Sequence, residues 1–341
     1  MKNILFTTHL DDKFIDGALV MIYSMKKHVK DFMEYPIRVL HSSVISELSV
    51  ENREKIKKLV PHVQFEDIYN ESYINAPVQY PKHRVAFLSL ECFRPTEYEK
   101  VFFFDCDMLC VEDISEGIET APNEYVSGCG GSPTDINCGL MVIGKSWLNE
   151  EVYNKMVECV NTMGTTRLFT QHMINHVVPE FNLLPDEYNW KVAPTVESKR
   201  LTHDGITDET KIIHWAGALP NTGENRKPNP KPWEEEEHAN VLSELWYSYK
   251  KEMSYGRILS EQMGCSLTYS GTVDRWEGTS LVDIGFITED DILNYTDENI
   301  KVNIDYNKEQ AVELENPQNY KPYLDEIRSW FPKVEITNTE D

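Results

Sequence analysis

Two aspartates lie one residue apart, directly after a run of large apolar side chains. Residues 101–107 read Val-Phe-Phe-Phe-Asp-Cys-Asp, so Asp105 and Asp107 end a segment that suits a strand covered on both faces. Because side chains alternate along an extended chain, the two carboxylates project to the same side. Such a pair of hard oxygen ligands suits Mg²⁺ or Mn²⁺ bound jointly with the oxygens of a substrate diphosphate. The structural alternative is a solvated strand end, since acidic pairs after strands are common.

A second segment with metal-binding potential lies far downstream. Lys211 to Trp215 predicts a short strand that carries His214, and Gly217 and then Lys231-Pro232-Trp233 follow it. A neutral imidazole in the ligand shell would favour Mn²⁺ over Mg²⁺, which prefers oxygen and water. Taken alone, His214 would more often be a histidine satisfied at a strand end. The acidic pair upstream makes metal binding the favoured interpretation.

The surrounding pattern predicts an α/β sheet. Short apolar runs typical of strands recur at Ile4 to Thr8, Ile37 to Leu40, Val63 to Ile68, Val101 to Phe104, Tyr125 to Ser127 and Leu140 to Ile143. An apolar stripe from Phe14 to Val29 predicts a helix after the first strand, and further helices are expected at about 149–163 and 171–178. Ligands of open α/β sheets bind beyond the carboxyl ends of strands. The loop Thr7 to Asp12 and the acidic pair are therefore expected to face one crevice.

Together, these motifs resemble glycosyltransferase family 8, which includes glycogenin-like and bacterial galactosyltransferase-like enzymes. The resemblance covers roughly residues 1 to 250 by motif order, and it implies a GT-A fold, a Rossmann-like mixed open sheet flanked by helices. In that family an Asp-x-Asp pair and a histidine hold Mn²⁺ against a nucleotide-sugar diphosphate, which by position implies Asp105, Asp107 and His214. It further implies retaining transfer of glucose or galactose from a UDP-sugar to a hydroxyl acceptor on a glycan or a protein-linked glycan.

The resemblance also assigns residues to the donor site by position. It places Thr8, His9, Leu10 and Asp11 against uracil and ribose, with Phe14 stacked on the base. For Phe14, an ordinary start of the apolar stripe of the first helix is the equal alternative. Further donor-site positions are Arg84, Cys106 and Gly217.

Other positions are implied to act on the transferred sugar and the leaving group. Lys231 would stabilise the departing diphosphate, and Gln171 and Asp135 would orient the sugar. Asn137-Cys138-Gly139 occupies the place of a family motif in which the Asn amide contacts sugar hydroxyls while Gly lets the backbone approach. Considered by itself, this tripeptide would be read as a turn.

Two positions depart from the family pattern. Thr170 stands where the family usually has Asp before Gln171, which excludes a covalent mechanism through that residue and favours same-face attack. Ser89 stands where the family normally offers Lys or Arg to the diphosphate, so Arg84 or Arg94 is the expected substitute. These departures keep open a sugar-nucleotide or glycan-binding module without turnover. A nucleotidyltransferase is a third and less favoured reading.

Composition limits the partners and the compartment. The formal net charge of −24 disfavours nucleic acid and anionic membranes, although a bound divalent cation can reverse the local potential at a nucleotide-sugar site. No apolar run reaches about 18 residues, and no cleavage-site pattern follows the N-terminus, so neither membrane insertion nor a signal peptide is expected. Seven cysteines without Cys-x-x-Cys spacing fit reduced thiols in the cytoplasm.

The pattern changes after about Tyr255. Residues 1–255 are predicted to form the glycosyltransferase domain, and residues 256–341 an acidic C-terminal appendage of unknown role. Aromatic residues such as Trp276 and Trp330 favour an ordered appendage, because disordered tails seldom contain them. It could mediate oligomerisation, extend the acceptor site or anchor a partner.

Overall fold

The computed structural model describes nine stretches of the chain, residues 2–78, 81–163, 169–192, 209–216, 231–234, 241–258, 265–270, 301–306 and 335–338. The chain divides into two compact units, Met1–Glu244 and Leu245–Asp341. The first unit holds the residues of the expected site. The boundary predicted near residue 255 from composition stays a prediction.

The first unit is built on a seven-stranded mixed sheet with the order β3-β2-β1-β4-β7-β6-β8. Its strands are β1 Ile4–His9, β2 Ile37–His41, β3 Gln64–Asp67, β4 Lys100–Phe104, β6 Val126–Ser132, β7 Asp135–Gly144 and β8 Asn182–Leu183. Strands β1 to β4 run parallel, and β7 is antiparallel to both β4 and β6. All six strands predicted from apolar runs are confirmed. Because β1 pairs with β2 on one side and β4 on the other, the chain reverses its direction of winding at β1, which is where such sheets bind ligands.

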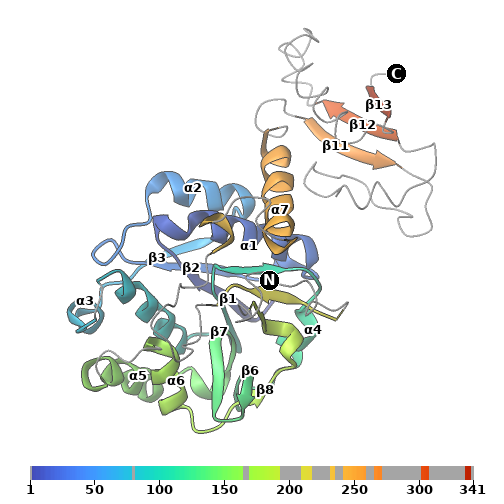
Figure 1. Ribbon diagram of the computed structural model, residues 1–341. Coiled ribbons are helices and arrows are strands. Elements are labelled where there is room, and N and C mark those ends of the chain that lie inside the picture. The colour runs from blue at the N-terminus through green and yellow to red at the C-terminus, as the bar shows by residue number, and fades with distance from the viewer. Residues whose placement is uncertain are drawn as a thin grey trace. The chain divides into compact units, whose positions relative to one another are not determined.

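Helices cover both faces of this sheet (Figure 1). The helices α1 Ile15–His28 and α2 Val50–Leu59 pack on one face, and η3 Pro81–Phe93, α5 Glu150–Thr162 and α6 Phe169–Val177 pack on the other. The three helices predicted from the sequence are confirmed. Asn149 caps the start of α5 by accepting from the amide of Val152. The last turn of α1 contains Lys26, Lys27 and His28, whose basic side chains suit the negative end of the helix dipole. Shorter helices are η1 Asp12–Phe14, η2 Phe32–Glu34, α3 Glu71–Asn75, α4 Ser115–Thr120, η4 Lys145–Trp147, η5 Asp186–Asn189 and η7 Pro232–Glu234.

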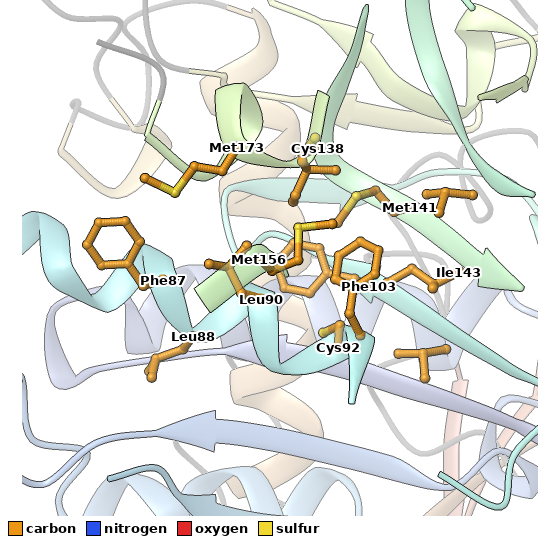
Figure 2. Close-up of a cluster of buried hydrophobic side chains, with 14 of the residues drawn as sticks. Phe87, Leu88, Leu90, Cys92, Phe103, Cys138, Met141, Ile143, Met156 and Met173 are labelled. Carbon is orange, nitrogen blue, oxygen red and sulfur yellow. The ribbon is translucent and has the colours of Figure 1, made fainter. Parts of the chain in front are cut away.

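Strand β4 is buried on both faces, as its four consecutive apolar residues predicted. Phe103 packs with Met141 and Ile143 of β7 against Met156, Met173 and apolar residues of η3 such as Phe87 and Leu90 (Figure 2). Phe102 points to the opposite face, where its ring lies 4.8 Å from that of Phe6. The central strand that precedes the acidic pair is therefore held rigidly from both sides.

A second, three-stranded sheet lies beyond the end of β4. Its order is β5-β10-β9, and its strands are β5 Met108–Cys110, β9 Trp190–Lys191 and β10 Ile212–His214. The hydroxyl of Ser24, fully buried in α1, donates to the carbonyl of Met21 and accepts from the amide of Cys110 at 3.0 Å. This bond ties β5 to the first helix.

The second unit contains a three-stranded sheet with the order β11-β12-β13. Its strands are β11 Cys265–Ser270, β12 Lys301–Tyr306 and β13 Glu335–Asn338. The helix α7 Val241–Ile258 spans the boundary between the units. Among the described residues, no helix combines the length and apolarity that crossing a membrane requires.

We expect Ser24→Ala to lower the free energy of unfolding by about 1–3 kcal/mol, because the buried amide of Cys110 loses its acceptor. Ser248→Ala is the matched control, since Ser248 makes the same hydroxyl bond to a carbonyl three residues back but on an exposed helix face. That variant should stay within about 0.5 kcal/mol of the parent. Urea unfolding measures both, and equal effects would contradict the role of Ser24.

Candidate functional site

The pairing of β5 with β10 brings the acidic pair and the histidine together. The two strands run antiparallel, and His214 pairs with Met108, the residue directly after Asp107. The amide of Trp215 then donates to the carbonyl of Asp107 at 2.9 Å, which extends the pairing past the strand end. Residues far apart in the chain thus meet through backbone hydrogen bonds.

The side chains converge as the sequence predicted. Nε2 of His214 lies 3.3 Å from Oδ1 of Asp107 and 3.9 Å from Oδ2 of Asp105. One ligand atom from each of the three residues lies within 4.8 Å of the others. Two ligand atoms about 2.1 Å from one octahedral ion and at right angles lie about 3 Å apart. The spacing and the donor types therefore fit one divalent cation.

A buried amide orients the imidazole for this arrangement. Nδ1 of His214 lies 2.8 Å from Oδ1 of Asn189, and both side chains are almost fully buried. A metal-binding histidine usually donates its second ring N–H to such an acceptor, which directs the other nitrogen toward the ion. Asn189, in η5, is a residue in contact with the cluster that the sequence analysis missed. No spacing or motif distinguishes it from other asparagines in loops.

Lys231 supplies a positive charge to the cluster. Its ammonium pairs with Oδ2 of Asp107 and donates to the carbonyl of Trp215 at 2.5 Å. Lys231 and His214 hold the pKa of Asp107 well below its usual range against the effect of burial. Burial and the neighbouring Asp107 raise the pKa of Asp105 to about 7. The two carboxylates thus differ sharply in proton affinity.

Gly139 lies at the centre of the site. Its carbonyl accepts from the amide of Asp105 at 2.7 Å. A Cβ atom at this position would lie 2.5 Å from Cε1 of His214 and 2.7 Å from Oδ2 of Asp105. Only glycine fits, because both neighbours belong to the converging cluster.

Asn137 and Gly139 lie inside strand β7, so the reading of this tripeptide as a turn is wrong. The tripeptide is too short to show from its own pattern that it belongs to a long strand, whose length depends on pairing with β4 and β6. The side chain of Asn137 reaches Oε1 of Gln171 in α6 at 3.3 Å. Asp135, at the exposed start of β7, accepts from Asn175 and lies roughly 13 Å along the strand from Gly139. The structure therefore brings Gln171 toward the cluster but keeps Asp135 apart from it.

The loop after β1 lies next to the acidic pair. Oγ1 of Thr8 is 3.3 Å from Sγ of Cys106, which also contacts the carbonyl of His9. Thr8, Leu10 and Cys106 are buried as whole residues, so these three have little surface to offer a ligand. Asp11 is also buried and accepts from Ser46 and from the amide of Lys13.

One ring nitrogen of His9 lacks a hydrogen-bond partner among the described residues. Burial lowers the pKa of His9 to about 4, so the ring is neutral near pH 7, and it stacks on Phe103 at 5.6 Å. Within the described part of the chain, its buried Nδ1 has no hydrogen-bond partner. This nitrogen is therefore a buried polar atom whose hydrogen bond is not satisfied among the described residues.

Phe14 lies beside the Lys231 segment. Its ring meets that of Trp233 edge to face at 5.8 Å, and Gly17 leaves the space that the Trp233 ring fills. The aromatic pair joins the start of α1 to the segment that carries Lys231.

The expected basic residues lie in different surroundings. Arg94 pairs with Glu66 and with the buried Glu91, which commits its guanidinium to a structural network. Ser89 is buried and donates to the carbonyl of Ala86. Nε of Arg84 donates to the carbonyl of Ala76. Gly217 lies outside the described residues.

Comparison with known proteins decides the family. The family model described as glycosyl transferase family 8 matches residues 5–237. The chain belongs to glycosyl transferase family 8. Glycogenin-1 of Caenorhabditis elegans is 24% identical over 257 residues, which cover 71% of this chain and 56% of that protein. The chain thus spans only about half the length of this relative.

Solved structures support the fold. Crystal structures of LgtC, one of an active-site mutant and one of the galactosyltransferase with donor and acceptor sugar analogs, both match with a TM-score of 0.54 and 14% identity. The mutant structure covers 73% of this chain and 95% of LgtC. The glycosyltransferase GlyE of Streptococcus pneumoniae TIGR4 matches with a TM-score of 0.52 and 16% identity, over 72% of this chain and 60% of GlyE. The GT-A fold expected for this family 8 chain is confirmed.

We expect Gly139→Ala to lower the free energy of unfolding of this family 8 protein by about 1–3 kcal/mol, because the new methyl group overlaps His214 and Asp105. Gly128→Ala, in the neighbouring strand β6, is the control. Its Cβ would first meet Cδ1 of Ile136, the end of a flexible side chain. Urea unfolding should show a smaller loss for the control, and equal losses would contradict the close fit at Gly139.

We expect Asp105→Asn to stabilise the metal-free protein at pH 8. The pKa of Asp105 is about 7 in the folded protein, whereas an unfolded Asp has a pKa of about 3.9. Between about pH 4 and 7 the folded parent therefore holds one more proton than the unfolded chain. Its free energy of unfolding therefore falls as the pH rises through this window, and the variant avoids that loss. The gain should be ~1–2 kcal/mol, since a third of the Asp105 side chain is exposed to solvent.

Thermal unfolding from pH 4 to 9 in the presence of a chelator measures this effect. The difference between parent and variant should vanish near pH 4. A variant that is less stable than the parent at pH 8 would show that the charge of Asp105 does not destabilise the folded protein.

Proposed function

We propose that this protein is a retaining hexosyltransferase that moves glucose or galactose from a UDP-sugar to a hydroxyl acceptor in an Mn²⁺-dependent reaction. The observation that carries the proposal is the convergence of Asp105, Asp107, His214 and Lys231 beyond the carboxyl end of β4 in a family 8 chain. The acceptor proposed is a glycan or a protein-linked glycan.

The donor set supports Mn²⁺, with Mg²⁺ as the second choice. Two carboxylates and one imidazole form a mixed oxygen and nitrogen set, which Mn²⁺ accepts more readily than Mg²⁺. When bound, the ion supplies Lewis-acid stabilisation of the charge that develops on the leaving diphosphate. Asp105, Asp107 and His214 would hold it, and Asn189 would orient the imidazole.

Lys231 is proposed to stabilise the departing UDP. Its ammonium already lies at Oδ2 of Asp107, beside the ligand atoms that would hold the ion. A positive charge fixed beside the developing negative charge lowers the barrier, because it needs little reorganisation during the reaction. Trp233 and Phe14 support the segment that carries this lysine.

Residues around the cluster are proposed to hold the rest of the donor. His9, Asp11 and Phe14 are proposed to bind the uridine, because the loop that carries them lies next to the acidic pair through the contact between Cys106 and the carbonyl of His9. Gln171 and Asn137 are proposed to orient the hexose. Asp135 is proposed to contact a more distant part of the bound sugars, because it lies away from the cluster.

Same-face attack is the proposed route. Thr170 offers no carboxylate for a covalent intermediate, so the acceptor oxygen forms its bond to the anomeric carbon on the side that the diphosphate leaves. The bond between that carbon and the diphosphate oxygen breaks, and its electron pair stays on the diphosphate, which also takes the acceptor proton. Positioning of both substrates supplies much of the rate.

The cytoplasm is the proposed compartment. The six cysteines with described side chains are free and buried, which fits a reducing environment. Residues 256–341 are proposed as the region through which the chain could associate with another copy or with its acceptor.

Donor turnover tests the proposal. UDP release from UDP-glucose and UDP-galactose should require Mn²⁺, and we expect Asp107→Asn and His214→Gln each to lower it by about 10²-fold or more, since each removes a metal ligand. Asp186→Asn and His176→Gln are the matched controls, because both residues are exposed and lie outside the site. They should retain the parent rate.

Three outcomes would overturn the proposal. If Asp107→Asn and His214→Gln both released UDP at the parent rate, the metal site would take no part in the reaction. Mn²⁺-dependent donor binding without UDP release would identify a binding module, and release of pyrophosphate from a nucleoside triphosphate would identify a nucleotidyltransferase.

A further inference from the structure

A chain of hydrogen bonds connects the imidazole of the cluster to α6. Nδ1 of His214 contacts Oδ1 of Asn189, and Nδ2 of Asn189 donates to Oδ1 of Asn137 at 3.0 Å. Oδ1 of Asn137 also accepts from the amide of Gly139 at 3.1 Å, and Nδ2 of Asn137 donates to Oε1 of Gln171. We propose that Asn189 is a positioning residue that fixes the tautomer of His214. The proposal rests on the proposed function, in which His214 binds the metal.

The direction of every bond follows from one backbone group. The amide of Gly139 can only donate, so the atom of Asn137 that it meets must be the side-chain oxygen. The other atom of Asn137 is therefore the NH₂ group. Asn189 approaches that same oxygen and must present its own NH₂ group to it. The oxygen of Asn189 is then the atom that faces His214.

This order settles the protonation of the imidazole. An oxygen of Asn189 can only accept, so Nδ1 of a neutral His214 must carry the hydrogen. Nε2 would then present its lone pair to a cation held between Asp105 and Asp107. The opposite tautomer would place two acceptors against each other at Asn189 and would point an N–H at the ion.

Burial and backbone bonds make the arrangement hard to replace. Asn189 is 1% exposed and His214 is 2% exposed, so water has little access to substitute for a lost amide. Asn189 directly precedes β9, which pairs in parallel with β10, and the amide of Val192 donates to the carbonyl of His214 at 2.9 Å. The backbone thus fixes Asn189 beside the ring.

The same chain couples the metal side of the site to the sugar side. Oε1 of Gln171 accepts from Asn137, which leaves the NH₂ group of Gln171 as the pair of donors for a bound sugar. Asn137 takes part in both halves, through its oxygen toward Asn189 and through its nitrogen toward Gln171. A change at Asn189 should therefore act first on the imidazole and only secondarily on Gln171.

The test reads the tautomer directly in the metal-free protein. Nitrogen-15 NMR of labelled histidine side chains at alkaline pH, with the His214 signal identified by its absence in His214→Gln, should show hydrogen on Nδ1 in the parent. Asn189→Leu should shift the ring toward hydrogen on Nε2. Asn189→Asp keeps an acceptor at Nδ1 and should retain the parent tautomer, although it loses the bond to Asn137 and some stability.

Metal affinity gives the second measurement. Mn²⁺ binding followed by electron paramagnetic resonance should weaken by about 10–100-fold in Asn189→Leu. Asn189→Asp should stay within about threefold of the parent. The control is Asn182→Leu, which removes a partly buried amide bonded to Ser127 and should leave Mn²⁺ affinity unchanged. If Asn189→Leu does not fold, Asn189→Ser gives the same reading, because its hydroxyl is too short to reach the ring.

The outcomes separate the two proposals. A parent-like tautomer and affinity in Asn189→Leu, or an equal shift in Asn189→Asp, would overturn the positioning role. A parent that shows the expected tautomer changes but binds no Mn²⁺ would overturn the proposed function and leave the role of Asn189 intact.

Discussion

The antiparallel pairing of β5 with β10 is the constraint on which the site depends. These strands have three residues each, yet their register sets His214 beside the residue that follows the acidic pair. Neighbouring elements hold this short pairing in place, since Ser24 of α1 accepts from Cys110 and the amide of Val111 donates to Lys211. A slip of one residue would turn the imidazole to the other face of the strand. The geometry of the cluster is thus encoded mainly by backbone hydrogen bonds rather than by the three side chains themselves.

The electrostatics of the cluster follow from this enforced proximity. Burial and the nearby charge of Asp107 raise the pKa of Asp105 to about 7, while Lys231 and His214 keep Asp107 ionised. A site that only stabilised the fold would be expected to pair each carboxylate with its own cation. Here Asp105 lacks such a partner at close range among the described residues, apart from the shared imidazole. This uncompensated carboxylate charge is what a bound divalent ion would neutralise.

The sequence predicted the parts of the molecule that have a local signature. Apolar runs and helical stripes marked the strands and helices around β4, and the Asp-x-Asp pair marked one half of the cluster. Other features had no such signature. Asn189 acts through a tertiary contact that only the pairing of β9 with β10 creates, and Asn137 lies in a strand whose extent depends on its neighbours. Arg94, weighed as a partner for the diphosphate, is instead held by Glu66 and Glu91, because a charge near the core needs compensation from the residues packed around it.

The chain is acidic overall, yet the proposed donor is an anion, and the charges of this cluster explain how the two can bind. A formal charge of −24 repels a nucleoside diphosphate at long range, although salt screens most of that field beyond about 10 Å. At short range, two carboxylates outweigh the single ammonium of Lys231, so the metal-free cluster is itself unfavourable for a diphosphate. A divalent ion reverses this sign and leaves the cluster net positive. Donor binding should then depend on the ion more strongly than in a basic site, where lysines and arginines alone could hold the phosphates. This dependence follows from the charge of the described residues, whichever hexose the donor carries.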